Sequence, residues 1–204
     1  MSAKVARTYS SPLRAEQAEQ TTARIVQAAV DLLSEGDASD LSMAEVAERA
    51  GVSVRTVYRS FASKDELLDG VIDWINAHLN QVTGARPETR QDYETTTAVV
   101  IEELFRIEPL YRALFATAAG RASHQRTAGR HDSMRGAYAA ELKGLDDGEA
   151  RRLLAVLNLV ASSSGALFMK DYWDLPPEDI GRVIEWAIRV LADAANDPAQ
   201  REGL

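Results

Sequence analysis

The sequence of 204 residues contains no cysteine. It can therefore form neither a disulfide nor a zinc site built on cysteine, and this composition suits a reducing compartment. The N-terminus carries Lys4 and Arg7, but no apolar run follows, so it lacks the pattern of a signal peptide. Apolar stretches elsewhere are interrupted by polar residues well before they reach the length of a membrane span. We expect a cytoplasmic protein with no membrane partner.

Motifs typical of enzymes and metal sites are also missing. The sequence has no glycine-rich phosphate loop, no GxSxG motif and no HExxH motif. The adjacent carboxylates Glu102-Glu103 and Asp146-Asp147 would not share one face of a helix. The histidines are His78, His124 and His131, which are too few and too scattered for a typical metal site. We therefore predict neither an enzyme, nor a metal, nor another cofactor.

Basic residues are in the minority. The 23 lysines and arginines stand against 31 aspartates and glutamates, which gives a net charge of −8. A protein that coats nucleic acid without specificity is basic over most of its surface, so this class is disfavoured. A specific DNA-binding protein needs only a local basic patch, and its acidic remainder would oppose non-specific binding.

Patterns typical of strands are scarce, and apolar residues mostly recur at spacings of three and four. This predicts an all-α fold with helices over residues 16–33, 63–80, 92–107, 110–119, 149–173 and 177–195, and two short helices within 41–61. The β-branched run at 95–101 could also suggest a strand, but Val100, Leu104 and Ile107 keep helical spacing. Pro109 should end or kink a helix. The polar stretch 121–142 gives the weakest pattern.

Glycine and proline near residues 84–87 mark the best candidate domain boundary. We expect a polar arm over residues 1–17, an N-terminal domain over 18–80 and a helical C-terminal domain over 81–204. Gly36 is a plausible end for the first helix. A serine followed three residues later by glutamate at Ser63 predicts a capping box that opens the helix at 63–80.

The most informative segment is SMAEVAERAGVSVRTVYRSFASK, residues 42–64. Ser42 and Glu45 form a capping-box pattern, and Ser53 can cap a second short helix. Ala47 is small enough for two helices to cross closely, and Gly51 falls where a sharp turn needs positive φ. Two short helices joined by a tight glycine turn are the helix-turn-helix arrangement, which we place at about residues 42–61.

The second short helix has a polar face suited to DNA. Arginine can reach guanine in the major groove, threonine can contact a thymine methyl group, and hydroxyls commonly hold phosphates. The predicted DNA-binding residues are Ser42, Ser53, Arg55, Thr56, Tyr58, Arg59 and Lys64. A solvated helix face would look similar, and so would a helical interaction protein that has lost DNA binding.

These residues resemble the TetR family of regulators. The matching run comprises Leu41-Ser42, Val46-Ala47, Ala50-Gly51-Val52-Ser53, Thr56-Val57-Tyr58, Phe61 and Ser63-Lys64-Asp65-Glu66-Leu67. The resemblance covers roughly residues 18–80. Many members carry His or Tyr immediately before the phenylalanine, where this chain has Ser60, which puts the operator sequence in doubt.

The resemblance implies a homodimeric repressor that leaves a palindromic double-stranded operator when a small molecule binds. The last two helices would then form a four-helix bundle across a two-fold axis. Positions expected to face the partner are Leu153, Val160, Val183, Ala187, Val190 and Ala194. The alternative is that they close the core of a monomer.

The effector is unknown, but a pocket for a small apolar or amphipathic molecule would be lined mostly by apolar residues. The predicted pocket residues are Phe105, Tyr111, Phe115, Tyr138, Asn158, Ser162 and Trp186, with Leu104, Met134, Phe168 and Met169 as further candidates. Asn158 and Ser162 lie four residues apart on one predicted helix face, where a ligand could pair with them. Alternatively, Ser162 bonds back along its own helix and Asn158 pairs with a neighbour.

Overall fold

The computed structural model describes residues 12–35, 41–84, 87–118, 121, 128–197 and 199–200. Within this part of the chain every regular element is a helix, which confirms the all-α prediction. The helices are α1 (Pro12–Glu35), α2 (Met43–Ala50), α3 (Val54–Ser60), α4 (Lys64–Thr83), α5 (Arg90–Arg106), α6 (Glu108–Ala116), α8 (Ala128–Ala137), α9 (Asp147–Val160), α10 (Ser163–Trp173) and α11 (Pro177–Asn196).

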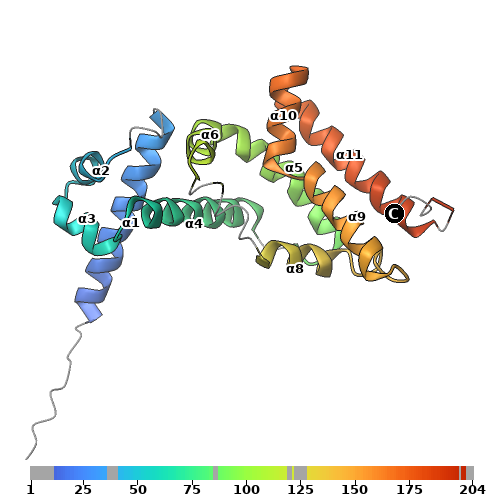
Figure 1. The fold of residues 1–204 in the computed structure, drawn as a ribbon, viewed down its shortest axis with the longest axis horizontal. Helices are drawn as coiled ribbons and strands as arrows, with labels where there is room; N and C mark the ends of the chain where they lie inside the picture. The colour runs from blue at the N-terminus through green and yellow to red at the C-terminus, as the bar shows by residue number, and fades with distance from the viewer. Residues whose placement is uncertain are drawn as a thin grey trace, which may run out of the picture.

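Helices α1 to α4 form the N-terminal end of the molecule, and α4 extends from it toward the C-terminal helices (Figure 1). Their shared core includes Ile25, Val46, Val57 and Leu67, each with a fully buried side chain. Burying one such side chain contributes roughly 1.5–3 kcal/mol. The apolar spacing of three and four along each helix therefore fixes how the four helices meet.

Helix α4 is joined to α5 by a polar contact. His78 Nε2 lies 2.7 Å from Glu103 Oε1, and Glu103 is only 7% exposed. The His78 ring also stacks on Trp74 at a centroid distance of 5.1 Å. The hydrogen bond from His78 is the main reason why the pKa of Glu103 lies below its ordinary value.

The C-terminal helices enclose a second apolar core. Helix α5 packs along α11, which buries Ile180, Ile184 and Ile188 at four-residue spacing. Helix α6 also packs against α1 of the N-terminal end. Two helices, α4 and α6, thus connect the N-terminal helices with the rest of the chain.

The prediction of a single helix over 149–173 is wrong. α9 ends at Val160 and α10 begins at Ser163, and the two are bent by 51° relative to each other. Ser162 caps the second helix: its hydroxyl donates to the Leu159 carbonyl at 2.7 Å and accepts from the Gly165 amide at 3.0 Å. Asn158 and Ser162 therefore do not share a helix face.

Other local predictions, for the segment 95–101, Pro109 and the cap at Ser63, agree with the structure more closely. The β-branched segment 95–101 is helical, within α5. Pro109 lies in the first turn of α6, after α5 has ended, and not in the interior of either helix. The Ser63 hydroxyl accepts the Glu66 amide at 3.1 Å, as predicted. The return half of that capping box is different, because the Glu66 carboxylate accepts the amide of Ala62. Gly36 and most of the polar arm lie outside the described residues.

No single described helix has the length and apolarity of a membrane span. Taken together, the bent pair α9 and α10 has the length and composition of a membrane span. Core helices of soluble proteins have the same length and composition, so this is weak evidence for a span. Among the described side chains, no three metal-binding groups gather into a potential metal site. The side chains of His124 and His131 lie outside the described part.

Candidate DNA-recognition surface

The turn between α2 and α3 depends on Gly51, which adopts φ 65° and ψ 37°. This left-handed conformation is readily available only to glycine. The Gly51 amide donates to the Glu48 carbonyl at 3.1 Å, and the Val52 amide donates to the Ala47 carbonyl at 2.9 Å. The turn thereby satisfies the last carbonyls of α2 and redirects the chain into α3 within three residues.

The N-terminus of α3 is capped locally. The Ser53 hydroxyl accepts the Thr56 amide at 3.1 Å and lies 2.8 Å from the Thr56 hydroxyl. Val57 is completely buried on the inner side of α3 and anchors it to the core. The cap and the anchor together determine which side of α3 faces outward.

The outward face of α3 carries Arg55, Tyr58 and Arg59, all exposed. Their spacing of three and four puts them on one side of the helix. Tyr58 is 52% exposed, although large apolar rings are usually more buried. Neither Arg55 nor Arg59 pairs its guanidinium with another described residue, so both are available to an outside anion.

Two arginines brace α2 instead of facing outward. Arg49 makes a bidentate ion pair with Glu35 of α1, at 2.9 and 2.7 Å, which lowers the pKa of the Glu35 carboxyl. Arg24 of α1 donates to the Ala50 carbonyl at 2.9 Å. These contacts fix α2 on α1, so that α3 is presented on a rigid base.

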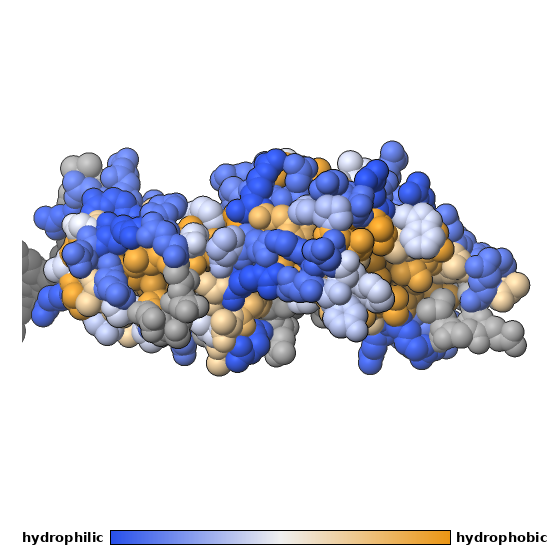
Figure 2. All heavy atoms as spheres, turned by 90° about the horizontal axis from the view of Figure 1, so that it is seen from above, coloured by the Kyte–Doolittle hydropathy of each residue, from blue (hydrophilic) through white to orange (hydrophobic). Residues whose placement is uncertain are grey.

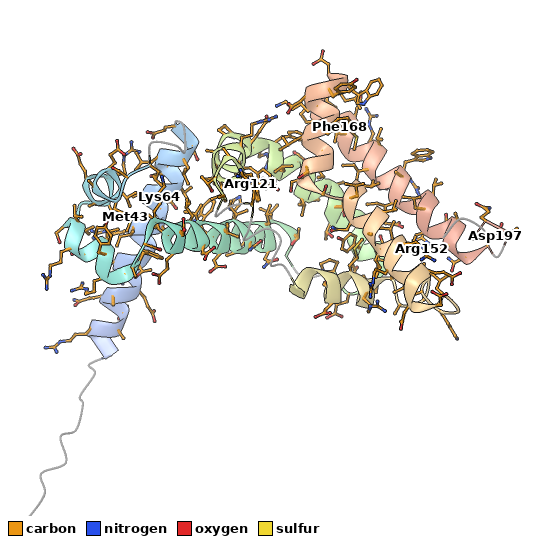
Figure 3. The ribbon with its side chains drawn as sticks, in the orientation of Figure 1. Met43, Lys64, Arg121, Arg152, Phe168 and Asp197 are labelled. Carbon is orange, nitrogen blue, oxygen red and sulfur yellow. The ribbon has the colours of Figure 1, made fainter. Side chains whose placement is uncertain are left out.

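The remaining predicted DNA-binding residues occupy different environments. Ser42 is half-buried and caps α2 in a complete capping box: its hydroxyl accepts the Glu45 amide at 3.2 Å, and the Glu45 carboxylate accepts the Ser42 amide at 3.1 Å. Lys64 lies at the start of α4, close in the chain to the end of α3 (Figure 3). Ser60 is half-buried in the last turn of α3. A direct role in DNA binding stays a prediction for all seven of the predicted residues.

Val54 is a residue that the sequence analysis missed. It is the first residue of α3 and is 42% exposed, next to the capping Ser53. An exposed apolar side chain at the start of such a helix can contact a thymine methyl group. Its position directly after the cap was the available signal, because the other valines of the segment, Val46, Val52 and Val57, face inward.

A second surface lies on the C-terminal helices, where large apolar side chains are exposed. They are Val156, Leu159, Phe168, Tyr172, Trp173, Val183, Trp186 and Val190. Figure 2 shows the whole molecule from above. Over the part where α10 and α11 lie, orange apolar surface is visible among polar side chains. Figure 3 shows Phe168 on α10 at the far end of this region. We refer to these eight residues as the C-terminal apolar face.

The predicted partner-facing positions divide in two groups. Val183 and Val190 are exposed, and Val160, Ala187 and Ala194 are half-buried, so these five are compatible with an interface. The prediction for Leu153 is wrong, because its side chain is 2% exposed and lies in the core of its own chain.

The predicted pocket residues also divide. Phe105, Tyr111, Phe115 and Tyr138 belong to the C-terminal apolar core. The rings of Phe115 and Tyr111 are in contact there, with a centroid distance of 4.1 Å and an angle of 32° between their planes. The prediction for Trp186 is wrong, since it is 59% exposed and belongs to the C-terminal apolar face.

Two polar members of the predicted pocket can be assigned more closely. Ser162 already uses its hydroxyl as the cap of α10. The Asn158 side-chain oxygen is buried and has no hydrogen-bond partner among the described residues, which leaves it open to a ligand. The pocket as a whole stays a prediction.

Comparisons with known proteins agree with this geometry. Residues 25–71 match the model of a family described as bacterial regulatory proteins, tetR family. The HTH-type transcriptional regulator YvdT of Bacillus subtilis is 31% identical over 85 residues, which is 41% of this chain and 43% of that protein. An HTH-type transcriptional repressor of Mycobacterium tuberculosis is 34% identical over 64 residues, which is 31% of this chain and 34% of that protein. The matched segments thus span less than half of either relative.

Solved structures resemble the chain over most of its length. A tetR-family transcriptional regulator from Streptomyces coelicolor superimposes with a TM-score of 0.63 at 18% identity, over 88% of this chain and 86% of that one. NalD of Pseudomonas aeruginosa, the secondary repressor of the MexAB-OprM multidrug efflux pump, gives a TM-score of 0.60 at 18% identity, over 85% and 96%. At such identities the likeness concerns the fold alone.

Proposed function

Because this chain belongs to the TetR family of bacterial regulatory proteins, we propose that it is a DNA-binding transcriptional regulator that works as a homodimer. The proposal is carried by α3, whose outward face presents Arg55, Tyr58 and Arg59 while its inner face is anchored by Val57. Family members are transcriptional regulators rather than enzymes. A regulator of this kind acts on DNA in the cytoplasm.

In this proposal α3 enters the major groove of the operator. Arg55 and Arg59 contact guanine edges or phosphates, Val54 contacts a thymine methyl group, and the Tyr58 hydroxyl holds a phosphate. Ser53 lies at the N-terminus of the same helix, where amide groups favour a phosphate. The net charge of −8 keeps non-specific binding low, so affinity depends on this small basic surface.

The test is binding of the full chain to the intergenic DNA upstream of its own gene, measured by fluorescence anisotropy over a range of salt concentrations. We expect Arg55→Ala or Arg59→Ala to weaken binding by about 1–3 kcal/mol if the arginine reads a base. A matched control is Arg182→Ala, which removes one positive charge from an exposed site on α11. Absence of specific binding at low salt would overturn the proposal, and equal affinities of all three variants would show that another face binds DNA.

The homodimer forms through the C-terminal apolar face. A surface that exposes eight large apolar side chains, four of them aromatic, is typical of a protein interface rather than of a monomer surface. A two-fold axis through this face would place two α3 helices one DNA turn apart, or a multiple of it, and so imply a palindromic operator. Sedimentation velocity at micromolar concentration measures the mass, and a monomer under these conditions would refute the dimer.

We further propose repression that is relieved by a small effector bound among the C-terminal helices. The Mycobacterium tuberculosis relative and NalD are both named repressors, which supports repression over activation. The buried Asn158 oxygen and the apolar ring cluster around Tyr111 and Phe115 are the features that a small apolar or amphipathic molecule would meet. Such a molecule releases DNA only if it binds better to the form that does not fit the operator.

A further inference from the structure

The C-terminal end of α3 is anchored by the ring of Phe61. Phe61 follows directly after α3, its amide donates to the Val57 carbonyl at 2.8 Å, and its side chain is only 8% exposed. Val57 lies about one helical turn earlier and is completely buried. The inner side of α3 thus has one anchor at its middle and another at its end.

The ring of Phe61 lies against Gly70 of α4. A Cβ at Gly70 would lie 3.0 Å from Phe61 Cε1 and 3.3 Å from Phe61 Cζ, whereas ordinary van der Waals contact begins at 3.4 Å. The same Cβ would lie 3.5 Å from Val26 Cγ2 of α1. Because Gly70 has no side chain, the edge of the ring can occupy this space between α4 and α1.

Gly70 adopts no conformation that requires glycine. It lies inside α4, and it is not among the described glycines with positive φ. Glycine in the interior of a helix is unfavourable relative to alanine. The backbone would therefore accept alanine at this position, and the contact with Phe61 is the feature of the structure that favours glycine.

The link from α3 to α4 is short and is tied to α4. It comprises Phe61, Ala62 and Ser63. The Ala62 amide donates to the Glu66 carboxylate at 2.6 Å, and the Ser63 hydroxyl accepts the Glu66 amide at 3.1 Å. Since Ala62 and Ser63 are both held by the first turn of α4, a displaced Phe61 ring would carry the end of α3 with it.

From these contacts we infer that Gly70 is a positioning residue for DNA recognition, an inference that rests on the proposed binding of DNA by α3. Gly70 determines how closely the end of α3 approaches α4. It thereby determines where Tyr58 and Arg59, both exposed in the last turn of α3, stand relative to the operator. A binding site has to be held within about 0.5 Å of its productive geometry, so even a small shift of α3 matters.

The test measures binding of the full chain to the intergenic DNA upstream of its own gene by fluorescence anisotropy. We expect Gly70→Ala to raise the Kd at least about fivefold, which is the lower end of the loss of one base contact. The matched control is Gly136→Ala on α8, where a Cβ meets no atom within 4 Å, and it should change the Kd less than about twofold. Equal Kd values of Gly70→Ala and the wild type would overturn the inference.

Urea unfolding separates a shift of α3 from a loss of the fold. Alanine is favoured in the helix, whereas its tight contact with the ring is unfavourable, so the unfolding midpoint of Gly70→Ala should stay close to that of the wild type. If the fraction of unfolded Gly70→Ala without urea accounts for its weaker DNA binding, the positioning role is overturned.

Phe61→Leu tests the contact of the ring directly. Leucine ends at its Cδ atoms and lacks Cε1 and Cζ, the two atoms that the alanine methyl group would approach. We expect the double variant Gly70→Ala/Phe61→Leu to bind DNA more tightly than Gly70→Ala alone. If Phe61→Leu weakens binding by the same factor with Gly70 as with alanine at that position, the two residues act independently and the inference is overturned.

Failure of this inference can be told apart from failure of the proposed function. Binding by the wild type that Arg55→Ala or Arg59→Ala weakens, together with wild-type affinity of Gly70→Ala, would overturn the positioning role and leave the proposed function standing. Absence of binding by the wild type would overturn both.

Discussion

The break between α9 and α10 includes a close backbone approach at Gly165, which makes Gly165→Ala a sharp test of the fold. A Cβ at Gly165 would lie 2.8 Å from the Leu159 carbonyl oxygen, whereas ordinary van der Waals contact begins at 3.4 Å. The Leu159 oxygen is part of the backbone and the new Cβ is bonded directly to it, so neither atom can move away by rotation of a side chain. The same carbonyl accepts the Ser162 hydroxyl, so displacing it would also weaken the cap of α10.

Two effects of opposite sign determine how much Gly165→Ala changes the free energy of unfolding. Alanine is favoured over glycine inside a helix by roughly 0.5–1 kcal/mol. Overpacking of a tightly packed site costs about 1–3 kcal/mol. We therefore expect Gly165→Ala to lower the free energy of unfolding by about 1–2 kcal/mol, because the clash involves backbone. For a chain of this size the melting temperature should fall by about 2–4 °C per kcal/mol.

The matched control is Gly181→Ala on α11, where a Cβ meets nothing within 4 Å and φ is not positive. This variant should raise the stability by roughly 0.5–1 kcal/mol. Urea unfolding followed by circular dichroism, at one protein concentration for all variants, compares the two. If Gly165→Ala stabilises the protein as Gly181→Ala does, the close approach to Leu159 is not a constraint.

Further predictions concern three other parts of the molecule. Phe61→Ala should lower the free energy of unfolding in urea by about 3–5 kcal/mol, because the ring is buried between the N-terminal helices; a smaller loss than about 1 kcal/mol would contradict its role. The hydrogen bond from His78 holds the pKa of Glu103 below its ordinary value, so the charged form stabilises the protein above the ordinary pKa and the benefit disappears as pH falls through the lowered pKa. Unfolding curves of Glu103→Gln and wild type should therefore differ most above the ordinary pKa of a glutamate and converge as the pH falls through the lowered one, and a constant difference would refute the contact with His78. Trp186→Ser should weaken dimerisation by roughly 2 kcal/mol in sedimentation equilibrium, with an unchanged circular dichroism spectrum; an unchanged dimer would remove this ring from the interface.

The recognition segment could be predicted from sequence because its determinants are local. Ser42 and Glu45, or Ser53 and Thr56, are three residues apart, and each pair forms the contact that its spacing predicts. Gly51 likewise determines its own turn conformation. Residue types and spacing therefore suffice for the two short helices and for the outward side of α3.

The C-terminal helices were harder to predict because their determinants are not local. Helix α11 carries apolar residues on two faces, and only the packed structure shows that Ile184 is buried in the core while Trp186 faces outward. The break before α10 was hidden by the apolar residues on both sides of Ser162. The Ser133 hydroxyl of α8 donates to the Pro87 carbonyl at 3.5 Å across 46 residues of the chain, and no local pattern predicts such a contact.

The bend of 51° between α9 and α10 also bears on the choice of partner. A straight apolar stripe can pair with many helices in several registers, whereas a bent surface fits only a surface of matching curvature. Because the C-terminal apolar face spans both arms of the bend, a copy of the same chain is its best complement. A bacterium that contains several regulators of this fold could thus keep their subunits from mixing through the angle set at Ser162, without any change in the recognition helix.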